Sequence, residues 1–128
     1  MTSQLKVDKL EGRTSAGSIL VKTASVETDL QEGLAKGWSR HEGGTTTIDS
    51  SFNCSSITDT ETGIPRHTFT SIFSAEDSYV VMGTAQSRCD DVGTSQYAAN
   101  FVDVRVTNID QSNQDRGNVA IIAHGDLA

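Results

Sequence analysis

YAANFVDVRVTN, residues 97–108, carries the clearest strand pattern in the chain. Valines recur at every second position, as Val102, Val104 and Val106, and the residues between them are charged, polar or aromatic. Strict alternation of this kind is typical of a β-strand that buries one side and exposes the other. The stretch therefore predicts a strand whose valines face a core, with Asp103 on the opposite side.

The segments around this strand are polar, and a second apolar stretch follows them. Residues 109–117 and 87–95 are rich in polar residues and glycine, so each predicts a loop. Residues 118–124 are apolar on both sides. A strand of that kind is covered on both faces. We expect it at the centre of a sheet or against another subunit.

Farther out, the chain alternates short β-branched or aromatic runs with turn residues. Residues 59–65, with Asp59, Glu61 and the single proline, predict a loop or hairpin turn. About seven strands at such spacing predict an all-β fold, an antiparallel β-sandwich with a jelly-roll-like order. The expected strands are residues 35–41, 45–48, 52–57, 66–73, 78–86, 97–108 and 118–124.

The first third of the chain has too little apolar surface to form a core of its own. Its one apolar run is Ile19, Leu20 and Val21, which suits a strand added to a partner. We therefore assign residues 1–33 to an N-terminal arm for trimerisation or attachment and residues 34–128 to the β-module. The spacing of apolar residues between 26 and 36 allows either a short helix or an extended passage.

Composition excludes several classes of function. Of the 128 residues, 35% are hydrophobic and the formal net charge is −7, with a mean hydropathy of −0.34. An acidic surface repels phosphate backbones and anionic lipid, so we expect no nucleic-acid partner. No apolar run approaches the roughly 20 residues of a spanning helix, so we expect no membrane insertion. The low hydrophobic content fits either a thin sandwich with one solvent-exposed face or a core that a partner chain completes. No apolar secretory signal opens the sequence, so we expect synthesis in the cytoplasm.

Residues that bind metals or form disulfides are few and scattered. His41, His67 and His124 lack metal-ligand spacing, so we expect no metal and no cofactor. A histidine on a trimer axis that rings an ion is the one alternative. Cys54 and Cys89 do not form a metal-type pair, and in a reducing compartment they are expected as free thiols in the core.

Catalytic motifs are not recognisable either, and we expect no enzyme. The sequence has no phosphate-binding glycine loop and no nucleophile elbow. The acidic residues that glycoside cleavage would require fall in predicted turns, where carboxylates are common anyway. Trp38, Tyr79 and Tyr97 could form a sugar-stacking platform, although packing in the core is the favoured interpretation of Trp38.

Three stretches carry a resemblance to a known family. Residues 7–17 read VDKLEGRTSAG, residues 30–38 read LQEGLAKGW, and residues 49–63 read DSSFNCSSITDTETG. In this order they resemble a module of tail-fibre and related virion proteins of marine bacteriophages, in which a GLAKxW segment precedes a DSFNxSSITDxxTG segment. The resemblance is strong in the first half of the chain. In the second half it extends only to a similar alternation of strands and turns.

The resemblance implies a virion protein that is assembled in the host cytoplasm as a homotrimer. The expected role is a tail-fibre or receptor-binding module, and the alternative is a decoration or cement protein bound as a trimer on the head. Expected partners are further copies of the chain, other virion proteins, and a receptor or glycan on the host surface.

A trimer would cover sheet edges and bury the Ile19–Val21 run. Surface loops are the usual contact sites, and the candidate outward residues are Asp59, Glu61, Arg88, Asp90, Asp91, Asn113 and Arg116.

Overall fold

The computed structural model describes residues 6, 7, 9, 19–23, 26–30, 33–42, 44–86 and 91–128. Contacts divide the chain into two units, residues 1–34 and residues 35–128, and each is described by itself. Throughout the described residues the regular elements are β-strands and none is a helix. This confirms the all-β prediction.

The first unit contains a β-hairpin. Its strands β1 (Leu20–Thr23) and β2 (Val26–Asp29) pair in antiparallel fashion, and the Leu30 N–H donates to the carbonyl oxygen of Ile19 at 2.8 Å. Leu20 and Val21 of the apolar run therefore pair with a strand of their own chain, and the assignment of residues 1–33 to trimerisation or attachment stays a prediction. The helix considered over residues 26–36 is also wrong, because β2 occupies its first turn.

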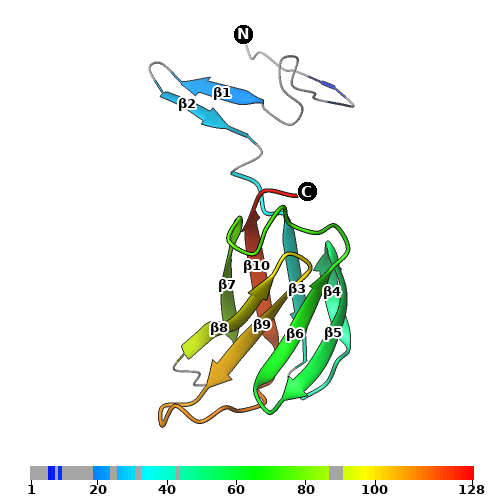
Figure 1. Ribbon diagram of the computed structural model, residues 1–128, viewed down its shortest axis with the longest axis vertical. Coiled ribbons are helices and arrows are strands. Elements are labelled where there is room, and N and C mark those ends of the chain that lie inside the picture. Colours follow the sequence, from blue (N-terminus) through cyan, green and yellow to red (C-terminus); the bar gives the residue numbers. More distant parts are fainter. Residues whose placement is uncertain are drawn as a thin grey trace. The chain divides into compact units, whose positions relative to one another are not determined.

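The second unit is a β-sandwich of two antiparallel four-stranded sheets (Figure 1). Sheet I has the strand order β4-β3-β10-β7, and sheet II has the order β5-β6-β9-β8. The strands are β3 (Gly37–His41), β4 (Ile48–Phe52), β5 (Cys54–Glu61), β6 (Ile64–Phe69), β7 (Tyr79–Ala85), β8 (Asp91–Ala98), β9 (Phe101–Thr107) and β10 (Val119–Gly125).

The connectivity differs from the jelly-roll-like order expected from the sequence. The pairs β3–β4, β5–β6 and β8–β9 are hairpins within one sheet, and the other connections cross between the sheets. A jelly roll, by contrast, changes sheet at almost every connection. The sandwich prediction is thus confirmed and the jelly-roll order is wrong.

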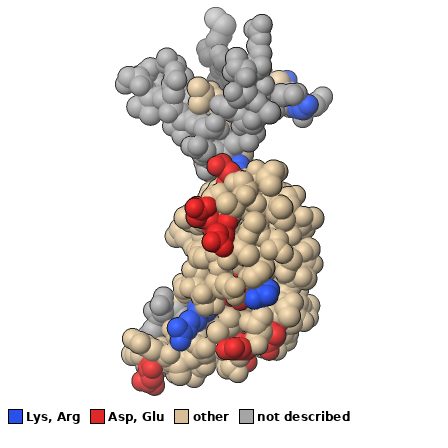
Figure 2. All heavy atoms as spheres, in the orientation of Figure 1, with Lys and Arg blue, Asp and Glu red and all other residues tan. Residues whose placement is uncertain are grey.

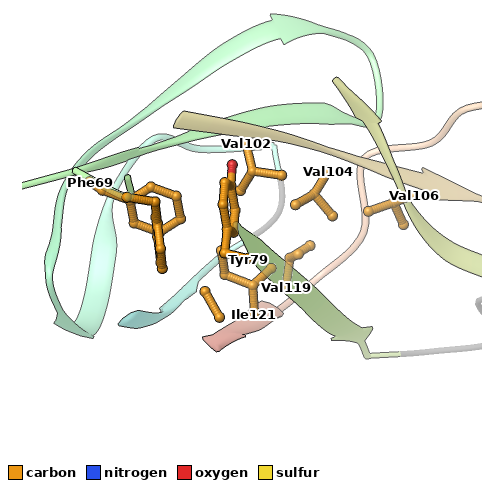
Figure 3. Packing of buried hydrophobic residues seen from close by; sticks show 9 residues of the cluster. Phe69, Tyr79, Val102, Val104, Val106, Val119 and Ile121 are labelled. Carbon is orange, nitrogen blue, oxygen red and sulfur yellow. The ribbon is translucent and has the colours of Figure 1, made fainter. Parts of the chain in front are cut away.

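The core lies between the two sheets, as predicted from the alternation in β9. Val102, Val104 and Val106 are at most 1% exposed, and they face Val119 and Ile121 of β10 (Figure 3). At one end of this layer, aromatic rings fill the space between the sheets. The ring of Phe73 stacks on that of Tyr79 with centroids 4.1 Å apart, and Phe69 packs edge-on against both.

Several strand boundaries differ from the sequence prediction. The predicted strand of residues 97–108 is divided, because residues 97–98 end β8, residues 99–100 form a turn and β9 begins at Phe101. The predicted strand of residues 66–73 is β6, which begins at Ile64 and ends at Phe69.

Strand β8 begins at Asp91, inside the predicted loop of residues 87–95, because it pairs with β9 along its whole length. Strand β4 begins at Ile48, where the predicted strand of residues 45–48 ends. Asn53 then takes the chain from sheet I to sheet II with a positive φ of 55°, a conformation that asparagine tolerates better than most residues.

Candidate functional site

Several connections meet at one end of the sandwich, which we call the loop end. Residues 62–63 form the β5–β6 turn, and residues 108–118 join β9 to β10. The β8–β9 register places Asp91 opposite Thr107 at this same end. Figure 1 shows the β5–β6 turn and the orange β9–β10 connection together at the lower end of the sandwich.

The structure brings most of the predicted outward residues to the loop end. Asp59 and Glu61 are exposed, but they are the last residues of β5 and do not form a wide loop. Asp91 is the first residue of β8, so its assignment to a loop is wrong. Asn113 and Arg116 lie in the β9–β10 connection, as predicted. Arg88 and Asp90 lie outside the described residues, as does Cys89.

Two of the connections are fixed to each other by hydrogen bonds. The Gly63 N–H donates to Asp115 Oδ1 at 2.7 Å, and the Gly63 carbonyl accepts from the Val106 N–H at 2.8 Å. Gly63 has a φ of 69°, and a Cβ there would lie 2.5 Å from the backbone nitrogen of Gln114. Only glycine fits such a position without strain. The β5–β6 turn is therefore held in one conformation against the β9–β10 connection, which gives the loop end a defined shape.

The tip of the β9–β10 connection is also ordered, by the side chain of Asn108. Its Oδ1 accepts from the N–H groups of Asp110 and Ser112 at 3.0 and 3.1 Å. The tip presents Ile109, which is 77% exposed. An exposed isoleucine among polar neighbours on an ordered tip is a suitable contact residue for a partner.

A second surface feature lies on the outer face of sheet I. Four large apolar side chains stand in register across all four strands and leave 38–71% of their surface exposed. From one edge of the sheet to the other, this apolar row consists of Phe52, Trp38, Ile122 and Met82. Val80 extends it along β7 and is 63% exposed. The prediction that residues 118–124 are buried on both sides is therefore only half confirmed.

The charge content of this face is low. Strand alternation and cross-strand register give the outward residues of sheet I, which are Trp38, Arg40, Ser50, Phe52, Val80, Met82, Thr84, Ala120, Ile122 and His124. None of these described residues is Asp or Glu. The one arginine among them is Arg40, whose Nε lies 3.7 Å from Asp49 Oδ2 of the edge strand in a solvent-exposed ion pair.

The outer face of sheet II differs from that of sheet I because it carries an ion pair. Arg66 donates two hydrogen bonds to the carboxylate of Asp103, at 2.7 and 2.8 Å, and its guanidinium lies 3.8 Å from the ring centre of Phe101. The ion pair and the stacked ring cover the middle of this face. Figure 2 views the molecule from the side of sheet II and shows both positive and negative groups on it.

A polar cluster lies inside the sandwich near the loop end. His41 and His67 meet edge to face with ring centroids 5.1 Å apart, and Ser39 Oγ lies 2.8 Å from His67 Nδ1. Burial, assisted by the neighbouring His41, lowers the pKa of His67 to about 3, and burial lowers the pKa of His41 as well. Both rings are therefore neutral near pH 7.

The thiol of Cys54 belongs to the same interior. Cys54 is free and buried, as predicted, and burial raises the pKa of its thiol. Within the described residues, no three His, Cys, Asp or Glu side chains come together as metal ligands. His124 is on the outer face of sheet I, away from the buried pair.

The sugar-stacking platform considered for the aromatic residues does not form. Tyr79 is buried, and its hydroxyl lies 2.8–2.9 Å from the carbonyl oxygens of Ala98 and Phe101. Trp38 faces outward from sheet I, so its assignment to the core is wrong. A sequence signal existed, because Trp38 and Arg40 share one side of a strand and an arginine is seldom buried.

Comparison of the chain with family models, with curated proteins and with solved structures gave no match. Among the described residues there is no helix of the length and apolarity that crossing a membrane requires.

Proposed function

We propose that this chain is a non-enzymatic structural protein of a bacteriophage particle, which works as a homotrimeric tail-fibre or receptor-binding module. The observation that supports this proposal most is that the two ends of the sandwich differ. The candidate contact residues that the structure describes lie at the loop end. The chain enters the sandwich at Ala35, at the opposite end, where the Lys36 N–H bonds to the carbonyl of Ala123.

This difference between the ends suits a protein that is anchored at one end and binds at the other. Attachment to other virion proteins is assigned to residues 1–33, and contact with a host receptor or glycan is assigned to the loop end. The loop end offers exposed carboxylates, amides and hydroxyls beside the apolar Ile109. That mixture suits a sugar or a protein loop, both of which combine hydrogen-bonding groups with small apolar faces.

The contact role is tested with the variant Ile109→Asp in the phage that encodes the chain. Its matched control is Ile72→Asp, which changes an exposed isoleucine at the opposite end of the sandwich. We expect the first variant to reduce host adsorption at least tenfold and the second to leave it unchanged, with both chains incorporated normally. Equal adsorption by the two variants would contradict a receptor-binding loop end.

The place in the particle is tested by counting copies per purified virion with quantitative mass spectrometry. A tail-fibre module is expected at a few tens of copies or fewer. A count in the hundreds would replace this role with head decoration, the alternative that the resemblance leaves open. Absence from the particle would contradict both roles.

A further inference from the structure

A small cavity lies at the loop end, between three connections of the sandwich. The β3–β4 connection lines it with Thr45, the β5–β6 turn with Gly63 and the β9–β10 connection with Arg116. The buried side chain of His41 lines it as well. Because the hydrogen bond from Gly63 to Asp115 joins two of these connections, the cavity has a defined shape.

Two residues that line the cavity carry nitrogens without a hydrogen-bond partner. Among the residues that the structure describes, three buried side-chain nitrogens have none, and two of these are His41 Nδ1 and Arg116 Nε. The His41 side chain is almost inaccessible from outside, since the residue is only 1% exposed. A buried polar atom without a partner costs free energy. A polar group that enters the cavity would remove this cost.

The size of the cavity limits what can enter it. It leaves about 20 Å³ in which the centre of a water-sized group can lie, and one water molecule requires roughly 10–15 Å³ of such space. One hydroxyl-sized group therefore fits inside, and the rest of a larger ligand would lie across the mouth of the cavity.

The lining selects a neutral group that both donates and accepts hydrogen bonds. Arg116 Nε–H can only donate, whereas the carboxylates of Asp59 and Asp115 can only accept. A cation would therefore be repelled by the arginine, and an anion by the two carboxylates. A hydroxyl group donates and accepts at once, and a neutral imidazole nitrogen such as His41 Nδ1 can take either role.

We propose that this cavity binds a hydroxyl group of a neutral sugar. The inference rests on the receptor-binding role proposed above and adds the chemical class of the ligand. The cavity is also lined by Thr45, Asp59 and Gln114, which bring a hydroxyl, a carboxylate and an amide from three segments of the chain. A sugar ring has hydroxyls on adjacent carbons, so one can enter while its neighbours reach these groups. A serine, threonine or tyrosine of a protein partner would bring a single hydroxyl.

The experiment titrates the full ¹⁵N-labelled chain at pH 7 with glucose, galactose, mannose, N-acetylglucosamine and the acidic sugar glucuronate, each up to about 100 mM. NMR spectra follow the backbone N–H signals and the Arg116 Nε–H signal. We expect at least one neutral sugar to shift the signals of Thr45, Gly63 and Arg116 Nε, while signals at the opposite end of the sandwich stay in place. Glucuronate should bind at least threefold more weakly, because the two carboxylates of the lining repel its charge.

Two variants provide the second readout. Arg116→Leu removes the donor, and Lys36→Leu makes the same change of charge at the opposite end of the sandwich. We expect Arg116→Leu to weaken binding of the sugar at least tenfold and Lys36→Leu to leave it unchanged, with similar circular dichroism spectra for both. Equal binding by the two variants would overturn the assignment to this cavity.

Absence of shifts with every sugar would also overturn the inference, and the cavity would then hold water only. A preference for glucuronate would contradict the choice of a neutral sugar. In either case the receptor-binding role stands or falls separately, by the adsorption of the Ile109→Asp variant.

Discussion

The rings of His41 and His67 meet edge to face in the interior of the sandwich, with 5.1 Å between their centroids. His41 comes from β3 of sheet I and His67 from β6 of sheet II. Among the described residues, His41 Nδ1 and His67 Nε2 have no hydrogen-bond partner. The pair is therefore a polar contact between the sheets that is stable only while both rings are uncharged.

Acid should weaken the fold through this pair. The pKa of His67 is lowered to about 3 from 6.5 by burial and by His41, so between these values the unfolded chain binds more protons than the folded chain. Stability is fully present above pH 6.5 and falls below it, by about 1.4 kcal/mol per pH unit for each such histidine. Urea unfolding at pH 7, 6, 5 and 4 measures the slope. His67→Gln should make it shallower, and parallel curves for the two proteins would contradict this account.

Phe73 should be one of the most sensitive positions of the core. It is fully buried and contacts the rings of Phe69 and Tyr79, so Phe73→Ala is expected to cost about 3–5 kcal/mol of unfolding free energy. Its neighbour Ile72 is 47% exposed, and Ile72→Ala should stay within about 0.5 kcal/mol. Chemical denaturation of both variants gives the comparison, and similar losses would show that the aromatic cluster is not the centre of packing.

Gly63 and Gly93 should respond in opposite ways to alanine. At Gly63 the backbone is left-handed and the new Cβ would meet the backbone of Gln114, so the loss should exceed about 1 kcal/mol. At Gly93, within β8, no atom lies within 4 Å of the new Cβ, and alanine should be neutral or stabilise by about 0.4–1 kcal/mol. Thermal unfolding of the two variants checks the signs. Limited proteolysis should also show faster cleavage of residues 109–112 in Gly63→Ala.

Mutations of the two partners of the ion pair on sheet II should have unequal effects on stability. The side chain of Asp103 is 7% exposed and that of Arg66 is 33% exposed. Arg66→Ala leaves a nearly buried carboxylate without its partner, whereas in Asp103→Asn the arginine can turn toward water. Arg66→Ala should therefore lower the melting temperature more than Asp103→Asn. The reverse order would contradict this account, because it would mean that the nearly buried carboxylate of Asp103 tolerates the loss of its partner.

The sequence was informative where one side of a strand is uniformly apolar. The valines of β9 predicted their own burial, and the predicted sandwich followed from strands and turns at regular spacing. The start of β8 was missed because Asp91 and Gly93 favour loops locally, whereas pairing with the long β9 supplies hydrogen bonds that outweigh that preference. The strand order could not be predicted from the sequence, because alternation shows which side of a strand is buried but not which strands are neighbours.

The candidate site was predictable to a similar degree. Acidic and amide-rich segments pointed to the loop end, but only the three-dimensional register shows that they meet there. The apolar row combines Phe52, Trp38, Ile122 and Met82 from four strands, of which only β3 and β4 are consecutive in the sequence. No local pattern could reveal it, although the shared side of Trp38 and Arg40 gave a hint.

The antiparallel pairing of β3 and β10 has a mechanical consequence. The chain enters at the start of β3 and leaves at the end of β10, so both lie at the same end of the sandwich. A force that pulls these two points apart peels the strands open one hydrogen bond at a time. Tension between the entry point and the loop end runs along the strands instead and loads many hydrogen bonds at once. We therefore expect the sandwich to resist tension between its entry point and the loop end, and to unfold more easily when the start of β3 and the end of β10 are pulled apart.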